Sequence, residues 1–142
     1  MRIRVETPLN PTEDLSKVIK ALKTVLETEY SVQEEEDTRK VVGEAEGIDR
    51  LQQFYNRLRE QYIVEAARGL LKKRAREREV IFFLNKQAAY VGKISFCAPE
   101  KESPMGAIKV TITSDKIEEV IDWLCPKTVK GKPQEVEPPI DA

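Results

Sequence analysis

The fold of this chain is decided by the segment VIFFL at residues 80–84, five apolar residues in a row within a sequence that is 35% charged. A run of this length is short for a helix and is typical of a central strand that is covered on both faces of a sheet. We therefore predict a strand at 80–84 and look for its partners in the segments on either side.

The residues that follow this strand predict a tight turn. Asn85 is suited to cap a short helical turn at 86–90, which Gly92 would close before a strand at 93–96. Residues 98–106 contain two prolines and are predicted to form a loop.

Two elements complete the second half of the chain. Residues 107–113 alternate between apolar and polar side chains, so we predict a strand that pairs with 93–96 as an extended hairpin. Ser114 or Asp115 would cap a last helix at 117–124, which Pro126 stops.

Upstream of VIFFL, residues 2–7 alternate as a strand with one buried face. Asn10, followed by a proline and then by Glu13, has the spacing of a capping box and predicts the start of a helix. Segments 30–36 and 40–46 predict two further strands that are joined near Asp37.

Apolar residues then recur at helical spacing from Leu51 to Leu70, which predicts one long or kinked helix over about 48–78. Gly69 is the expected weak point of this helix, because glycine costs roughly 1 kcal/mol relative to alanine in a helix.

The order β-α-β-β-α(long)-β-β-β-α predicts an α+β fold, a mostly antiparallel sheet with helices packed on one face. At 142 residues the chain is expected to form one domain, placed at 1–126. Residues 127–142 are rich in proline and charge without periodicity, so a loose C-terminal tail is predicted there.

The composition excludes several classes of enzyme. The chain has no histidine, which excludes Ser-His and Cys-His catalysis, and its six glycines match neither the Walker pattern nor the dinucleotide fingerprint. We predict a non-enzymatic protein without a cofactor.

Cellular location is predicted from the cysteines and from hydropathy. Cys97 and Cys125 are too far apart for a redox or zinc motif, and no apolar run is long enough to span a membrane. These features predict a cytoplasmic protein with reduced thiols and no membrane partner. The many charges and only three asparagines also favour a heat-adapted source.

The run Glu34-Glu35-Glu36-Asp37 is the one dense group of carboxylates that could hold a divalent metal, as in a metal-dependent nuclease. The alternative is an exposed strand that its charges keep from self-association. We favour the second interpretation and predict no metal site.

Charge is distributed unevenly along the chain. Residues 27–46 carry eight carboxylates and two cations, whereas residues 57–78 carry eight cations and three carboxylates. Arg68, Lys72 and Arg76 are spaced by four and would form a stripe on one helix face, beside Lys73. Such a stripe can bind phosphates, complement the helix dipole, or pair with the acidic segment of the same fold.

A second polar group follows VIFFL, where the predicted central strand emerges. It consists of Asn85, Lys86, Gln87, Tyr90 and Lys93. Amides read base edges, lysines bind phosphate and an exposed tyrosine can stack on an unpaired base, a combination that suits single-stranded RNA. The alternative is that Asn85 is only a cap and Tyr90 only a core residue.

Four segments carry a resemblance to a known family: ETPLNPTED at 6–14, FFLNKQAAYVGKISF at 82–96, PMGAIKVTI at 104–112 and IEEVIDWLCP at 117–126. Together they resemble an archaeal family labelled predicted RNA-binding, sometimes called a predicted exosome subunit. The resemblance implies a fold similar to the fifth protein of the large ribosomal subunit and implies RNA as the partner.

These observations combine into one hypothesis and one rival. We predict a non-catalytic RNA-binding protein whose backbone contacts come from Arg68, Lys72, Lys73 and Arg76, and whose base or sugar contacts come from the group Asn85, Lys86, Gln87, Tyr90 and Lys93. It would act alone, as a homodimer, or as a subunit of an RNA-processing complex. The rival is a protein-assembly module in which the acidic strands of one copy meet the basic helix of another.

Overall fold

Strand β4 (Glu79–Asn85) lies inside a six-stranded sheet in the computed structural model, which describes residues 1–98 and 106–140. The strand order is β2-β3-β1-β6-β4-β5, and every neighbouring pair is antiparallel. The other strands are β1 (Arg2–Pro8), β2 (Tyr30–Glu35), β3 (Thr38–Glu46), β5 (Phe96–Cys97) and β6 (Ala107–Thr113). The predicted α+β class with an antiparallel sheet is therefore confirmed.

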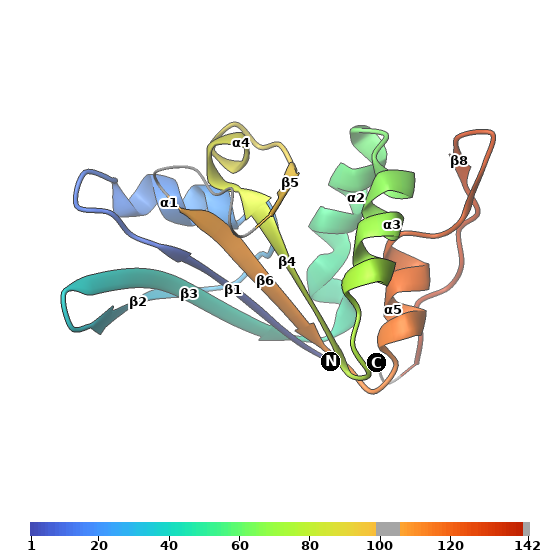
Figure 1. Cartoon of the computed structure of the whole chain (residues 1–142), viewed down its shortest axis with the longest axis horizontal. Helices are drawn as coiled ribbons and strands as arrows, with labels where there is room; N and C mark the ends of the chain where they lie inside the picture. Colours follow the sequence, from blue (N-terminus) through green and yellow to red (C-terminus); the bar gives the residue numbers. More distant parts are fainter. Residues whose placement is uncertain (99–105, 141–142) are drawn as a thin grey trace.

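The helices form two groups along the sheet (Figure 1). Helix α1 lies beside the short α4 near one end, whereas α2, α3 and α5 lie together near the other end. Their bounds are α1 (Leu15–Leu22), α2 (Gln52–Glu60) after the 3-10 turn η1 (Ile48–Leu51), α3 (Val64–Arg74), α4 (Lys86–Tyr90) and α5 (Ile117–Leu124). This arrangement leaves part of the sheet without a helix over it.

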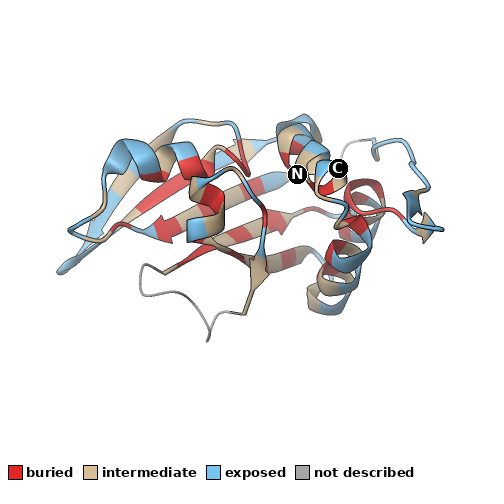
Figure 2. Ribbon diagram, turned by 90° about the horizontal axis from the view of Figure 1, so that it is seen from above, coloured by how far each residue is buried: buried red, intermediate tan, exposed pale blue. Residues whose placement is uncertain are grey.

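One face of the sheet forms the core and the other remains partly exposed (Figure 2). On the core face Val5 pairs with Val110, which in turn pairs with Phe82, and all three are fully buried. On the opposite face Ile81 and Phe83 are only half-buried. The prediction that β4 is covered on both faces is therefore wrong: Val80, Phe82 and Leu84 are buried, whereas Ile81 and Phe83 on the second face are only partly covered.

The predicted long helix is two helices, and the break is not at Gly69. Chain direction changes at Gln61–Ile63, where Tyr62 has a left-handed φ of 58° and the amide of Ile63 donates to the carbonyl of Leu58. This six-to-one bond is the usual way in which a left-handed residue ends a helix. Gly69 lies inside α3 on an exposed turn, so the helix tolerates it.

Strand pairing also differs from the predicted hairpin. Residues 93–96 were expected to pair with 107–113, but only Phe96–Cys97 is a strand, and it pairs with β4. Strand β6 lies on the other edge of β4 and pairs with β1 as well. The apolar run therefore separates the two segments that the sequence predicted to be neighbours.

The described part of the C-terminal segment is not loose. It forms a two-stranded hairpin from β7 (Thr128–Val129) and β8 (Lys132–Pro133). Beyond it, the Glu135 carboxylate accepts hydrogen bonds from Arg59 Nη2 at 2.7 Å and from the Tyr55 hydroxyl at 2.8 Å. The Tyr55 ring stacks on Trp123 with centroids 4.7 Å apart. These contacts hold the segment against α2 and α5, which the tail's composition did not reveal.

A buried ion pair joins the start of the chain to the turn after β4. Lys86 Nζ lies 2.9 Å from Glu13 Oε1, and both side chains are fully buried. Glu13 also accepts from the Tyr90 hydroxyl at 2.6 Å and from the backbone amide of Asn10 at 3.0 Å. Burial raises the pKa of Glu13, but these donors outweigh it and hold that pKa below its ordinary value. The carboxylate is therefore ionised and fixes the Asn10 loop onto α4.

We predict that Lys86→Met lowers the free energy of unfolding by about 3–5 kcal/mol, because it leaves a buried carboxylate without its cation. Equilibrium unfolding in urea measures this loss. The matched control is Lys93→Met, which removes an exposed lysine seven positions further and should change stability by less than about 0.5 kcal/mol. Equal stability of the two variants would show that the ion pair contributes nothing.

Candidate nucleic-acid interface

Two of the four cations that were predicted to bind phosphate, Arg68 and Lys72, are engaged within the fold. Arg68 Nη1 lies 2.9 Å from Asp122 of α5 and donates to the carbonyl of Cys125 at 2.9 Å. Lys72 Nζ lies 2.6 Å from Glu118 and 3.0 Å from Asp122. Burial raises the pKa of Asp122, yet Lys72 and Arg68 outweigh it and lower that pKa. The stripe is therefore not a free cationic surface, and Arg68 and Lys72 serve to hold α3 against α5.

The other two predicted cations point elsewhere. Helix α3 ends at Arg74, so Lys73 belongs to its last turn and Arg76 lies beyond it, in the connection to β4. Both side chains are exposed, and neither is within ion-pair distance of a described carboxylate. Arg76 is fixed through its backbone amide, which donates to the carbonyl of Glu79 at 2.7 Å. Lys73 and Arg76 are thus available to a ligand.

Arg74, between these two cations, lies across the exposed face of β4. Its Nε donates to the carbonyl of Ile81 at 2.6 Å, and its guanidinium carbon is 5.6 Å from the centroid of the Phe83 ring. This distance is within the range of a cation-π contact. The hydrogen bond satisfies an outward carbonyl of β4 and fixes the guanidinium beside the aromatic ring.

These residues surround a pocket of about 550 Å³ on the exposed face of the sheet, which we call the sheet-face pocket. Its lining combines apolar residues of α3 and β4 with basic residues from three elements. The lining residues are Leu70, Lys73, Arg74, Arg76, Glu79, Ile81, Phe83 and Lys109. Four cations therefore surround a half-buried phenylalanine, and Glu79 is the one carboxylate among the described lining residues.

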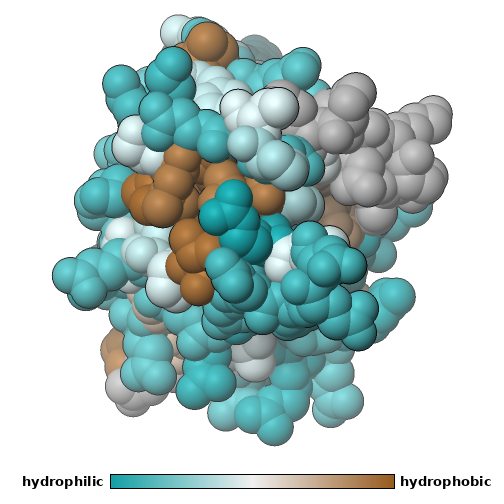
Figure 3. Space-filling view, turned by 90° about the vertical axis from the view of Figure 1, so that its left-hand side faces the viewer, coloured by the Kyte–Doolittle hydropathy of each residue, from teal (hydrophilic) through white to brown (hydrophobic). Residues whose placement is uncertain are grey.

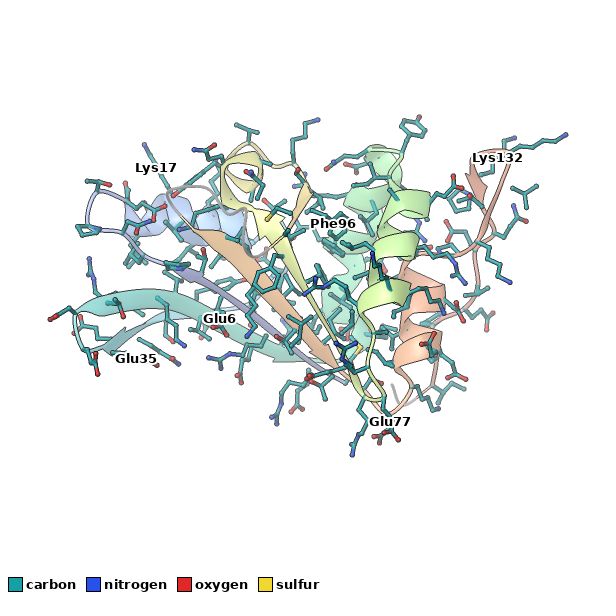
Figure 4. The ribbon with its side chains drawn as sticks, viewed as in Figure 1. Glu6, Lys17, Glu35, Glu77, Phe96 and Lys132 are labelled. Atoms are coloured by element: carbon teal, nitrogen blue, oxygen red, sulfur yellow. The ribbon has the colours of Figure 1, made fainter. Side chains whose placement is uncertain are left out.

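The strand register brings Lys109 into this pocket. Glu6 of β1, Lys109 of β6 and Phe83 of β4 lie side by side across three strands. Glu6 is held more closely by Arg4, at 2.6 Å, and by Lys40, at 3.6 Å. Burial raises the pKa of Glu6, but these cations outweigh it and lower that pKa. Figure 4 shows Glu6 on the sheet, well away from α3. The charges around β1 largely compensate one another, whereas cations outnumber carboxylates around Phe83.

The second predicted group, after β4, is mostly structural. Asn85 caps α4, because its side-chain oxygen accepts from the amide of Ala88 at 2.9 Å. Lys86 is fully buried against Glu13 and therefore cannot reach a base or sugar, which corrects the prediction. The Tyr90 hydroxyl donates a hydrogen bond to Glu13. Burial raises the pKa of Tyr90, and the nearby Glu13 carboxylate raises it further. Gln87 and Lys93 alone are exposed.

The structure does not bring the two predicted groups together. Helix α4 packs beside α1, whereas α3 packs against α5 and the other side of β4 (Figure 1). The end of the molecule that Figure 3 faces is largely hydrophilic, with a hydrophobic patch near its centre and further apolar atoms at the top and the lower left. The polar turn and the basic helix therefore belong to different surfaces.

The carboxylate run lies at the exposed edge of the sheet. Glu34 and Glu35 belong to edge strand β2, and Glu36, with a left-handed φ of 53°, is in the turn to β3. Figure 4 shows Glu35 at this tip. Within residues 1–98 and 106–140, no group of three or more histidine, cysteine or acidic side chains is placed to hold a metal ion. No described helix is long and apolar enough to cross a membrane.

Comparison with known proteins gives the family. A family model described as RNA binding matches residues 2–114. The chain belongs to this family. A UPF0201 protein of Aeropyrum pernix is 45% identical over 94% of this chain and 90% of its own length. A UPF0201 protein of Sulfurisphaera tokodaii is 44% identical, covering 93% of this chain and 92% of its own.

Solved structures agree with this assignment. The crystal structure of a UPF0201 protein from Methanococcus jannaschii has a TM-score of 0.83 and 30% identity, over 94% of this chain and 98% of that one. A second UPF0201 crystal structure has a TM-score of 0.78 and 33% identity, over 94% and 99% of the two chains. The resemblance to an archaeal RNA-binding family is thus confirmed, whereas the exosome link and the ribosomal-protein-like fold stay predictions.

Sequence reasoning missed Phe83, Arg74 and Lys109. One signal was present: side chains along a strand alternate between the two faces of a sheet, so Ile81 and Phe83 had to lie on the face opposite Val80, Phe82 and Leu84. Arg74 and Lys109 carry no comparable signal, because strand register and the end of α3 decide where they lie.

We predict that the double variant Arg68→Gln, Lys72→Gln lowers the free energy of unfolding by roughly 1 kcal/mol, because three partly exposed ion pairs to α5 are lost. Urea unfolding measures the loss. The control Asp122→Asn removes the shared partner of both cations and should cost a similar amount. Unchanged stability of the double variant would show that α3 is not held to α5 by these charges.

Proposed function

We propose that this protein binds single-stranded RNA at the sheet-face pocket and does so without catalysis. The observation that carries the proposal is the half-buried Phe83 ring on an uncovered sheet face, with Lys73, Arg74, Arg76 and Lys109 around it. Membership of a family described as RNA binding supports RNA as the ligand.

Each part of the pocket has a separate role in the proposal. An exposed aromatic ring offers a stacking surface to any unpaired base, worth about 1–3 kcal/mol per base. Lys73 and Arg76 are exposed and unpaired, so they neutralise backbone phosphates. Arg74 is already fixed by Ile81 and can stack or bind phosphate without a large loss of freedom.

Single strands are favoured over duplexes by the shape of this surface. The aromatic ring is part of β4 and lies in the floor of the pocket, so only a base that has left its stack can reach it. Protein sheets that bind RNA commonly stack unpaired bases on such aromatic side chains. The proposed ligand is therefore an unstructured strand or a loop.

The rival assembly function is weakened by the ion pairs of α3. Arg68 and Lys72 were half of the basic surface that it required, and α5 of the same chain neutralises them. The acidic edge strand β2 remains exposed, so a homodimer or a place in an RNA-processing complex stays a prediction.

We predict that Lys73→Gln, Arg76→Gln flattens the salt dependence of RNA binding. The slope of log affinity against log salt for a labelled oligouridylate should fall by about 1.4, because two phosphate contacts to a single strand are lost. Fluorescence anisotropy across a salt series measures it. The control is Lys130→Gln, Lys132→Gln in the C-terminal hairpin, where Figure 4 shows Lys132 far from β4, and its slope should not change. An equal fall in both variants would refute a local site.

We predict that Phe83→Leu weakens binding of the same oligouridylate by roughly 5- to 150-fold while leaving the salt slope unchanged, because it removes a stacking surface and no charge. The same anisotropy series reports both quantities. Ile81→Leu is the control, since it keeps an aliphatic residue on the same face of β4. Wild-type affinity in Phe83→Leu would contradict base stacking at this ring.

A further inference from the structure

A second basic cavity lies between α1, α2, α4 and the turn after α4. It has a volume of about 560 Å³, and its cations are Lys20 and Lys23 of α1 and Arg57 of α2. Tyr90 and Gly92 of the turn complete its wall. We call it the α1–α2–α4 groove. It shares no lining residue with the sheet-face pocket, so it is a separate site.

The charge of this groove is not compensated locally. No carboxylate is among the lining residues in the described part of the chain. Lys23 Nζ lies 3.7 Å from Glu27, but both side chains are largely exposed, and an exposed pair of this kind contributes little. Lys20 is exposed and has no ion pair with a described residue. Three cations from two helices therefore face one cavity, which favours an anionic ligand.

Arg57 is the most constrained of the three cations. Its Nη1 donates to the carbonyl of Gly92 at 2.8 Å, which fixes the guanidinium against the turn. Gly92 has a left-handed φ of 76°, and a Cβ at that position would lie 3.4 Å from Arg57 Nη1. The Nε of Arg57 is buried and has no hydrogen-bond partner in the described structure. This atom is closed to solvent, so a ligand in the groove would contact Arg57 through its terminal N–H groups.

We propose that the α1–α2–α4 groove binds a phosphate group, and that it provides a second contact for the RNA strand. The second clause rests on the function proposed above. A guanidinium presents its N–H groups in a planar fork that matches two phosphate oxygens, and ammonium groups on either side add charge. Arg57 in its fixed position supplies the fork, and Lys20 and Lys23 supply the flanking charge.

The test uses the full ¹⁵N-labelled chain and follows the backbone amide of Gly92. Inorganic phosphate and a short oligouridylate are titrated separately, so that a free phosphate and an RNA phosphodiester are distinguished as sources. The variant Lys20→Gln, Lys23→Gln should weaken the binding that shifts Gly92 by about tenfold or more. Lys17→Gln is the matched control, because Lys17 is exposed on the same helix and does not line the groove (Figure 4).

The outcomes separate this proposal from the previous one. The groove is supported as a binding site if phosphate or the oligouridylate shifts the Gly92 amide signal, if this binding is weaker in Lys20→Gln, Lys23→Gln, and if it is retained in Lys17→Gln. Wild-type RNA affinity in Phe83→Leu together with a retained phosphate response at Gly92 would overturn only the proposed function. No response of Gly92 to phosphate or RNA would overturn the groove. An equal response to polyglutamate would overturn its assignment to phosphate.

Discussion

When helices cover one face of a six-stranded sheet, the residues on its second face must be stable without a hydrophobic layer over them. Over β1 and β3 these residues are paired charges, because Arg4 bridges Glu6 and Glu44. Over β4 the second face instead carries the half-buried Phe83, with Arg74 beside it. The uncovered face is thus mostly compensated charge, with one region that is apolar and cationic. That region is the one that can accept a ligand.

The cations of α3 divide according to the direction in which each side chain leaves the helix. Arg68 and Lys72 face α5, where Asp122 accepts from both and contributes to helix packing. Lys73 and Arg76 face solvent at the end of the helix, beside the sheet. A basic segment of sequence therefore performs two tasks, and only the second is available to a polyanion. The net charge of −1 is consistent with local rather than global attraction to RNA.

The buried pair of Glu13 and Lys86 joins two distant segments among the four on which the family resemblance rests. The first contributes Asn10 and Glu13, the second contributes Lys86 and Tyr90, and all four meet in one hydrogen-bonded cluster. A buried charge requires its partner, so these residue types are needed for the fold. In the sequence this cluster resembles a binding motif, because polar residues near the end of a strand can either bind a ligand or stabilise the fold.

The sequence by itself determined most of the elements, the α+β class and the cap of α4 by Asn85, because alternation, helical spacing and capping are local properties. It placed the start of α1 at Asn10, whereas Asp14 caps this helix in the structure. It also determined that charge is divided into an acidic and a basic segment. The tertiary structure alone decided which face of β4 is uncovered, which cations α5 neutralises and that Lys86 is buried. These facts depend on contacts between residues far apart in the chain. A side chain's charge is encoded locally, but whether that charge is free depends on what packs against it.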